Sequence, residues 1–242
     1  IKLAPLIREL DSDPGRFLTR VCVTAQHRDL LDQVLAVFAI APQWDLGVME
    51  EDQDPLEVAS RCLSRLRPVL ETEQPDWVIV QGDTTTTVAA SLAAYYLGIR
   101  VAHVEAGLRT GDKRRPFPEE MNRRLTSCLA DLHFAPTLQA RNNLLRAGIP
   151  AEQIHVTGNT GIDALFNVAK RDYDLNRLNI RVASKKKMIL VTTHRRENFG
   201  TPLRNICEAV SRIARRHSEI TTVVLPVHKN PIVASVVHET LG

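Results

Sequence analysis

The chain has 242 residues, 44% of them hydrophobic and 24% charged, and its 31 basic and 28 acidic residues leave a formal charge of +3. This composition is that of a globular protein with one large or two modest domains, and it excludes a disordered or collagen-like chain. A net charge this small does not indicate electrostatic binding to nucleic acid or to a membrane surface. The sequence contains neither a run of ~18 apolar residues nor a signal-peptide pattern, so we expect a cytoplasmic protein.

Short β-branched runs alternate with helical patterns along almost the whole chain, which is typical of βαβ units. In the predicted helix 86–96, Val88, Leu92 and Tyr95 recur at spacings of three and four residues. With right-handed crossovers, these units predict a doubly wound parallel sheet covered on both faces. The predicted strands are 18–25, 76–81, 100–104, 132–135, 154–158, 188–193 and 221–227.

Residues 171–187 interrupt this alternation, because they are polar and end in a lysine run. We interpret them as a linker between a domain at 1–170 and the start of a second domain at 188–242. The second part holds only two predicted strands and two helices, too few to bury a sheet well. We therefore expect either that it packs on the first domain or that more chain follows Gly242.

Several common catalytic and metal-binding patterns are absent from the sequence. It contains no G-x-G-x-x-G after the first predicted strand, no P-loop, no G-x-S-x-G and no H-E-x-x-H. Dehydrogenase, P-loop kinase, serine esterase and zincin functions therefore lose their main support. Asp131 and His133, beside and on a predicted strand, are interpreted as structural, and no metal site is expected. The four cysteines lack a C-x-x-C pair, which favours reduced packing residues. They are Cys22, Cys62, Cys128 and Cys207.

Ligands of parallel α/β sheets bind beyond the carboxyl ends of the strands, so the loops there are candidates for chemistry. Asp83 follows one strand and precedes four threonines, a cluster suited either to a sugar or simply to capping a helix. Glu105 follows the next strand and is not needed for packing, although it could be a surface carboxylate paired with Arg109. Glu119 and Glu120 could act chemically or could merely complement a helix dipole.

The loop beginning His194-Arg195-Arg196 gives the strongest local signal. It offers an acid near neutral pH and bidentate donors for phosphate oxygens directly after a predicted strand. The alternative interpretation is a solvated basic loop. His228 and Lys229 repeat this pattern after the next strand, where the alternative is a helix-start turn before Pro231.

Eight ordered strings distributed along the chain, taken together, resemble the non-hydrolysing UDP-N-acetylglucosamine 2-epimerases. The strings are TAQHRDLLDQVL, VQGDTTTTVAASLAA, VAHVEAGLRTGD, PFPEEMNRRL, HFAPT, VTGNTGIDAL, VTTHRRENFG and PVHKNP. The resemblance implies two Rossmann-like, doubly wound parallel-sheet domains of the glycosyltransferase-B kind, the second incomplete in this chain. It also implies a homodimer that interconverts UDP-GlcNAc and UDP-ManNAc for bacterial surface polysaccharide synthesis. In this family UDP is eliminated to give 2-acetamidoglucal and is then re-added, without a cofactor.

The resemblance also implies roles for particular residues. Asp83, Glu105 and Glu119 would be the carboxylates that supply acid and base on the two faces of the sugar, and which of them first takes the proton stays open. His194 would lie near the diphosphate. The substrate or UDP would be bound by Lys2, Arg195 and His228, and a regulatory UDP-GlcNAc site would include Gln26 and His27.

Family members begin with a strand and a GTRPEA-like loop before the IKLAPL of this chain, and they continue beyond Gly242. We therefore expect this chain to be a fragment that is inactive or unstable alone. Two rival functions are a UDP-sugar glycosyltransferase and a non-catalytic nucleotide-sugar sensor. No acceptor motif supports the first, and a full acid/base set with His194 argues against the second.

Overall fold

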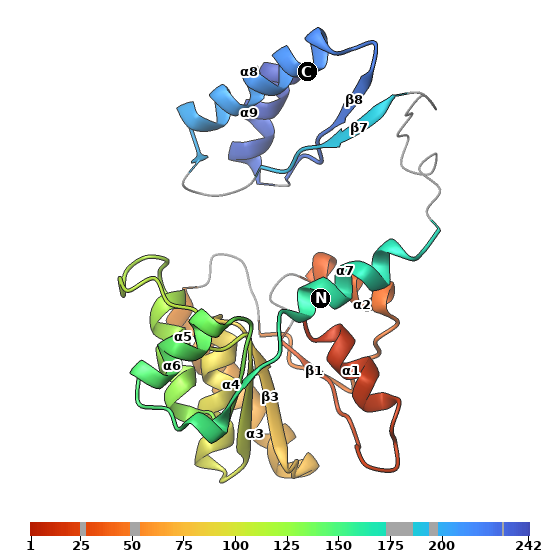
Figure 1. Ribbon diagram of the computed structural model, residues 1–242. Coiled ribbons are helices and arrows are strands. Elements are labelled where there is room, and N and C mark those ends of the chain that lie inside the picture. Colours follow the sequence, from red (N-terminus) through yellow and green to blue (C-terminus); the bar gives the residue numbers. More distant parts are fainter. Residues whose placement is uncertain (25–27, 49–53, 173–185, 194–197, 229) are drawn as a thin grey trace. The chain divides into compact units, whose positions relative to one another are not determined.

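The computed structural model describes residues 1–24, 28–48, 54–172, 186–193, 198–228 and 230–242. The chain divides into two compact units, Ile1–Arg171 and Asp172–Gly242, which are both visible in Figure 1. Most of the predicted linker, 173–185, lies outside the described residues, so the domain limits at 170 and 188 stay predictions.

The first unit is an α/β structure in which every described strand pairing is parallel, as predicted. Four strands form one sheet in the order β3-β4-β5-β6, and β1 pairs with β2 separately. The strands are β1 (Cys22–Val23), β2 (Trp44–Asp45), β3 (Trp77–Gln81), β4 (Arg100–Val104), β5 (Leu132–Ala135) and β6 (Ile154–Val156). The helices are α1 (Ala4–Asp11), α2 (Arg28–Phe38), α3 (Pro55–Glu73), α4 (Thr85–Tyr96), α5 (Glu119–Leu129), α6 (Leu138–Arg146) and α7 (Thr160–Ala169), with a short 3-10 helix at Ala151–Gln153.

The strands at 100–104 and 132–135 agree with the prediction, whereas the one at 18–25 was predicted too long. Only Cys22 and Val23 form β1, because its partner strand β2 consists of just Trp44 and Asp45. Cys22 pairs with Trp44, and Val23 pairs with Asp45. The sequence also failed to predict β2, since a two-residue strand carries no alternating or β-branched run.

Residues at helix starts cap the exposed backbone N–H groups, and this fixes where two helices near the strand ends begin. Thr84 caps α4, its hydroxyl accepting a hydrogen bond from the Thr87 N–H at 3.3 Å. Asn159 caps α7 in the same way, accepting from the Gly161 N–H at 2.8 Å. The capping interpretation of the threonine cluster is therefore confirmed for Thr84.

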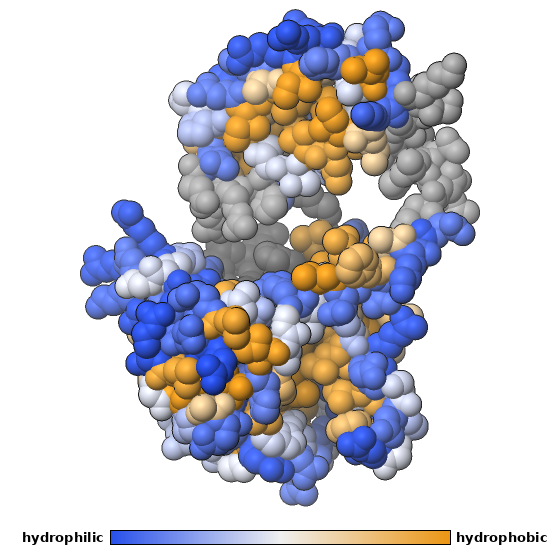
Figure 2. Space-filling view, viewed as in Figure 1, coloured by the Kyte–Doolittle hydropathy of each residue, from blue (hydrophilic) through white to orange (hydrophobic). Residues whose placement is uncertain are grey.

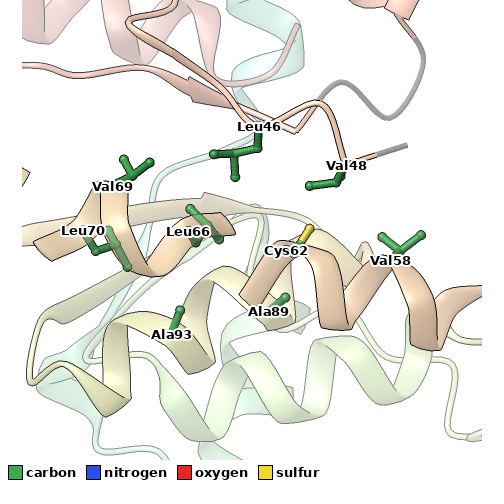
Figure 3. Packing of buried hydrophobic residues seen from close by; sticks show 9 residues of the cluster. All are labelled: Leu46, Val48, Val58, Cys62, Leu66, Val69, Leu70, Ala89 and Ala93. Atoms are coloured by element: carbon green, nitrogen blue, oxygen red, sulfur yellow. The ribbon is translucent and has the colours of Figure 1, made fainter. Parts of the chain in front are cut away.

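Among the described residues, the largest apolar cluster centres on α3 (Figure 3). One face of this helix, repeating at intervals of about four residues, packs on Ala89 and Ala93 of α4, whose small side chains allow the two helices to approach closely. Leu46 and Val48, just after β2, cover α3 from its other side. The α3 residues of the cluster are Val58, Cys62, Leu66, Val69 and Leu70. This packing joins β2 to the helices next to the larger sheet.

The second unit contains β7 (Lys187–Leu190), α8 (Thr201–Arg216), β8 (Thr221–Val224) and α9 (Pro231–Leu241). Its two strands are parallel, and α8 and α9 share an apolar cluster. The cluster consists of Leu203, Cys207, Val233 and Val237. Both strands are shorter than predicted, ending at Leu190 and Val224 rather than at residues 193 and 227.

All four cysteines are free thiols, but Cys128 is exposed, so its interpretation as a packing residue was wrong.

Apolar side chains line the exposed side of α7 in Figure 2, where Ile162, Leu165 and Phe166 are each more than half exposed. Within the described residues, no helix is both long enough and apolar enough to cross a bilayer.

Candidate active site

The centre of the site is the carboxylate of Glu105, which directly follows β4. Lys2, ahead of α1, places its Nζ 2.6 Å from both carboxylate oxygens. Gln81, the last residue of β3, donates from Nε2 to Oε2 at 2.5 Å, and Asn159, the cap of α7, donates from Nδ2 to Oε1 at 3.2 Å. Three donors from separate parts of the first unit therefore hold a side chain that is only 12% exposed.

The backbone around Glu105 is also unusual. Glu105 has a φ of +65°, in the left-handed region that non-glycine residues seldom adopt. Gly107, two residues later, has a φ of +88°, and a side chain there would collide with the Ala140 carbonyl of α6. Strained backbone of this kind is concentrated at functional sites, where the surrounding structure enforces it.

Asp83 follows β3, the strand beside β4, at the same edge of the sheet. Arg123 of α5 donates to Asp83 Oδ2 from Nε at 2.9 Å and places Nη2 2.8 Å from the same oxygen. Asn122 Nδ2 donates to the Asp83 carbonyl oxygen at 2.9 Å. Neighbouring residues of α5 thus hold both the side chain and the backbone of Asp83.

A buried histidine contacts the backbone of Gly82, the residue between Gln81 and Asp83. The Nε2 atom of His103, on β4, lies 2.8 Å from the Gly82 carbonyl oxygen, and the His103 side chain is fully buried. Burial lowers the pKa of His103 to about 4 despite the hydrogen bond to Gly82, so the ring is neutral near pH 7 and donates its Nε2 proton to that carbonyl.

Two adjacent glutamates begin α5 and have different surroundings. The Oε2 atom of Glu119 is buried and has no hydrogen-bond partner among the described residues. Glu119 and Arg123 are four residues apart on α5, a spacing that puts two side chains in neighbouring positions on a helix surface. Glu119 thus places a carboxylate with a buried oxygen at the start of the helix whose Arg123 holds Asp83.

Glu120 is fully buried and structural. It accepts from the Thr110 N–H at 3.0 Å and pairs with Arg123 at 3.1 Å and Arg124 at 3.2 Å. Burial would raise the pKa of Glu120, but the hydrogen bonds from Thr110, Arg124 and Arg123 outweigh it and lower this pKa below its usual value. Glu120 therefore does more than complement the dipole of α5, since it joins this helix to the loop after β4.

The alternative in which Glu105 pairs with Arg109 is wrong, and several predicted site residues lie outside the described residues. Arg109 does not pair with Glu105, because its Nη2 donates to Ser127 Oγ at 2.9 Å. His194, Arg195, Gln26 and His27 lie outside the described residues, and so does Lys229. His228 belongs to the second unit, where its Nδ1 accepts from the Asn230 N–H at 3.1 Å, and Asn230 caps α9. The helix-start interpretation of this turn is therefore confirmed.

The sequence predicted Lys2 as a site residue, but it did not predict the other side chains that hold the carboxylates. Gln81, Asn159 and Arg123 all lie within the strings noted above, but a pattern alone does not say which distant carboxylate each one binds. Only Arg123 gave a local signal, being four residues after Glu119 in a predicted helix.

No group of three or more metal-ligating side chains occurs in the described part of the chain. Asp131 has a structural contact, since its Oδ2 accepts from the Val101 N–H at 2.7 Å. His133 lies fully buried on β5, in register with His103.

Comparison with known proteins identifies the family. A family model described as UDP-N-acetylglucosamine 2-epimerase matches residues 8–242. The chain belongs to this family. It is 51% identical over 249 residues to the UDP-N-acetylglucosamine 2-epimerase of Salmonella typhimurium, covering all of this chain and 66% of that protein. It is 50% identical to the Bacillus subtilis enzyme of the same name, again over all of this chain and over 63% of that protein.

Solved structures of the family agree with the fold. The Neisseria meningitidis UDP-GlcNAc 2-epimerase bound to UDP-GlcNAc has a TM-score of 0.86 at 44% identity, over 99% of this chain and 66% of that one. The S. aureus MnaA structure with UDP has a TM-score of 0.87 at 45% identity, over all of this chain and 63% of that one. The expected fold class, parallel α/β of the glycosyltransferase-B kind, is thus confirmed. This 2-epimerase family chain spans slightly less than two thirds of the length of these relatives.

Proposed function

We propose that the protein containing this chain is a non-hydrolysing UDP-N-acetylglucosamine 2-epimerase that interconverts UDP-GlcNAc and UDP-ManNAc. The observation that carries the proposal is the pair of carboxylates, Asp83 and Glu105, which separate sets of donors hold at one edge of the sheet. Asp83 follows β3, Glu105 follows β4, and Glu119 begins α5, the helix whose Arg123 contacts Asp83. The family membership and the relatives' named activity support the same conclusion.

The reaction requires a proton to leave one face of carbon 2 and another to arrive on the opposite face. In the first half a carboxylate takes the carbon 2 proton, the C2–H electrons form the C1=C2 double bond, and the bond from carbon 1 to the UDP oxygen breaks with its electrons on UDP. In the second half a carboxylic acid protonates carbon 2 from the other face as UDP returns to carbon 1. Atoms and electrons balance without an oxidant, so no cofactor is needed.

The residues divide this chemistry between them. Asp83, Glu105 and Glu119 supply the acid and base, and Glu119 Oε2 is buried without a hydrogen-bond partner among the described residues. His194 supports the departing diphosphate, while Arg195 and His228 bind its oxygens. Lys2 is proposed to contact UDP from its position beside Glu105. Gln26 and His27 contribute to a regulatory UDP-GlcNAc site.

The resemblance to the family also supports a homodimer acting in the cytoplasm on nucleotide sugars for surface polysaccharide synthesis. These assignments concern the whole protein, and the chain spans about two thirds of the length of the relatives it matches.

The decisive experiment is incubation of the full-length protein with UDP-GlcNAc in D2O, followed by proton NMR. We expect UDP-ManNAc to appear and deuterium to enter carbon 2 in both sugars. Transfer of the sugar to an acceptor, or UDP-GlcNAc binding without exchange, would replace the proposal with the glycosyltransferase or the sensor.

A further inference from the structure

Arg123 contacts two acidic side chains from different parts of the first unit. Its Nε and Nη2 atoms both lie within 2.9 Å of Asp83 Oδ2, and its Nη1 lies 3.1 Å from Glu120 Oε2. The Arg123 side chain is 12% exposed, compared with 30% for Asp83 and 0% for Glu120. The guanidinium is thus held between a fully buried anchor and a carboxylate that faces partly outward.

The anchor itself is firmly fixed. Glu120 receives the Thr110 N–H from the loop after β4 and the Arg124 guanidinium from α5, in addition to Arg123. A buried carboxylate with donors from a loop and a helix has little freedom to move, because any displacement would leave a buried charge unpaired. Arg123 therefore meets Asp83 at a position that Glu120 sets.

The geometry at Asp83 leaves one oxygen available. Both Arg123 donors converge on Oδ2, and no described residue bonds Oδ1. The Asp83 backbone is fixed at the same time by Asn122. Torsion of the carboxylate is therefore restricted, and Oδ1 keeps a defined direction without competing for a donor.

We propose that Arg123 is a positioning residue for Asp83, orienting its carboxylate for proton transfer while remaining anchored on Glu120. The inference rests on the proposed epimerase function and assigns a role to a residue that touches Asp83 rather than the reacting carbon. Only a planar guanidinium reaches two acidic partners in this way, since a lysine ammonium is a single point charge on a flexible stem.

The test uses the full-length protein with Arg123→Met and Arg123→Lys, and with Arg124→Met and Arg124→Lys as matched controls. Arg124 is the neighbouring arginine on α5 and pairs with the same Glu120, but no contact between it and Asp83 occurs among the described residues. Each variant is assayed for kcat and KM with UDP-GlcNAc, for deuterium entry at carbon 2, and for Tm.

We expect Arg123→Met to lower kcat about 100-fold with KM within about threefold, because misplacing a catalytic group by an ångström costs that much. Arg123→Lys should recover about tenfold of this loss by restoring a charge beside Asp83, and deuterium exchange should fall in parallel with kcat. The Arg124 variants should keep kcat within about threefold even where Tm falls.

Equal losses of kcat in the Arg123 and Arg124 variants would overturn the inference, and so would an effect of Arg123→Met confined to KM. If Arg123→Met does not fold, the comparison of Arg123→Lys with Arg124→Lys decides by the same criteria. If the wild-type protein does not exchange deuterium, the proposed function itself is rejected. If the wild-type protein is active and the Arg123 variants are unaffected, only the role of Arg123 is rejected.

Discussion

The Nζ atom of Lys2 lies 2.6 Å from each carboxylate oxygen of Glu105, a residue 103 positions further along the chain. This contact gives Lys2 a second possible role beside UDP binding, and the two roles predict different kinetics. If Lys2 chiefly orients Glu105, Lys2→Met should lower kcat by about tenfold or more and leave the affinity for UDP unchanged. Loss of UDP affinity with kcat retained would instead assign Lys2 to the nucleotide. Lys113→Met, at an exposed position, is the control for loss of a positive charge.

The three carboxylates should be needed for exchange at carbon 2 but not for binding the nucleotide. Asp83→Asn, Glu105→Gln and Glu119→Gln each keep the size of the side chain and remove its acid/base capacity. We expect deuterium entry to fall by about 10²- to 10⁴-fold in each, with UDP binding measured by calorimetry intact. Glu152→Gln, exposed in the short 3-10 helix, should behave as wild type. Normal exchange in any of the three variants would remove that residue from the mechanism.

Gly107 should be far less tolerant of substitution than Gly111, although both have positive φ, +88° and +84°. An alanine Cβ at Gly107 would overlap the Ala140 carbonyl and come within 2.9 Å of Leu144 Cγ, whereas at Gly111 it would meet no described atom within 4 Å. We expect Gly111→Ala to cost about 1–2 kcal/mol from backbone strain alone, and Gly107→Ala about 2 kcal/mol more. Thermal unfolding of the two variants measures the difference. Equal shifts in Tm would show that α6 moves away from the turn after β4 at little cost.

His103 should make the protein less stable in acid. Burial lowers its pKa to about 4 in the folded state, from 6.5 for an ordinary histidine. Between these values the unfolded chain binds the proton and the folded chain does not, so stability falls as the pH drops from about 6.5 to about 4. Full stabilisation is present above pH 6.5, and roughly 3 kcal/mol is lost across this window.

The matched variant for this effect is His103→Gln, whose amide can still donate to the Gly82 carbonyl but does not titrate in this range. Urea unfolding of the full-length protein at several pH values should show a flatter profile for this variant between pH 4 and 6.5. An unchanged slope would mean that other groups, rather than His103, produce the acid sensitivity.

The sequence predicted the part of the site that depends on local position. Asp83 and Glu105 could be recognised because each follows a strand, and parallel neighbours end at the same sheet edge. The partners of these residues could not be recognised, since Lys2 and Asn159 reach Glu105 across 103 and 54 positions respectively. No periodicity in a single sequence encodes such pairings, because they depend on how helices pack against the sheet.

Strand lengths were predicted less well than strand positions for a related reason. The β-branched residues at 18–25 favour an extended chain, but hydrogen-bonded length depends on the partner strand. Trp44 and Asp45 provide only two paired residues. Within the four-stranded sheet, by contrast, β4 has partners on both sides, and its predicted limits agree with the structure.

The donors to Glu105 and Asp83 among the described residues all belong to the first unit. The dipoles and charges around these two carboxylates are therefore arranged when this unit folds, before any sugar arrives. In water, solvent would have to reorient around a carboxylate each time its proton moved, and that reorganisation is a large share of the barrier to proton transfer. Here the free energy of orienting these groups is already part of the folding free energy. Binding energy from the nucleotide can then be directed to breaking the bond at carbon 1.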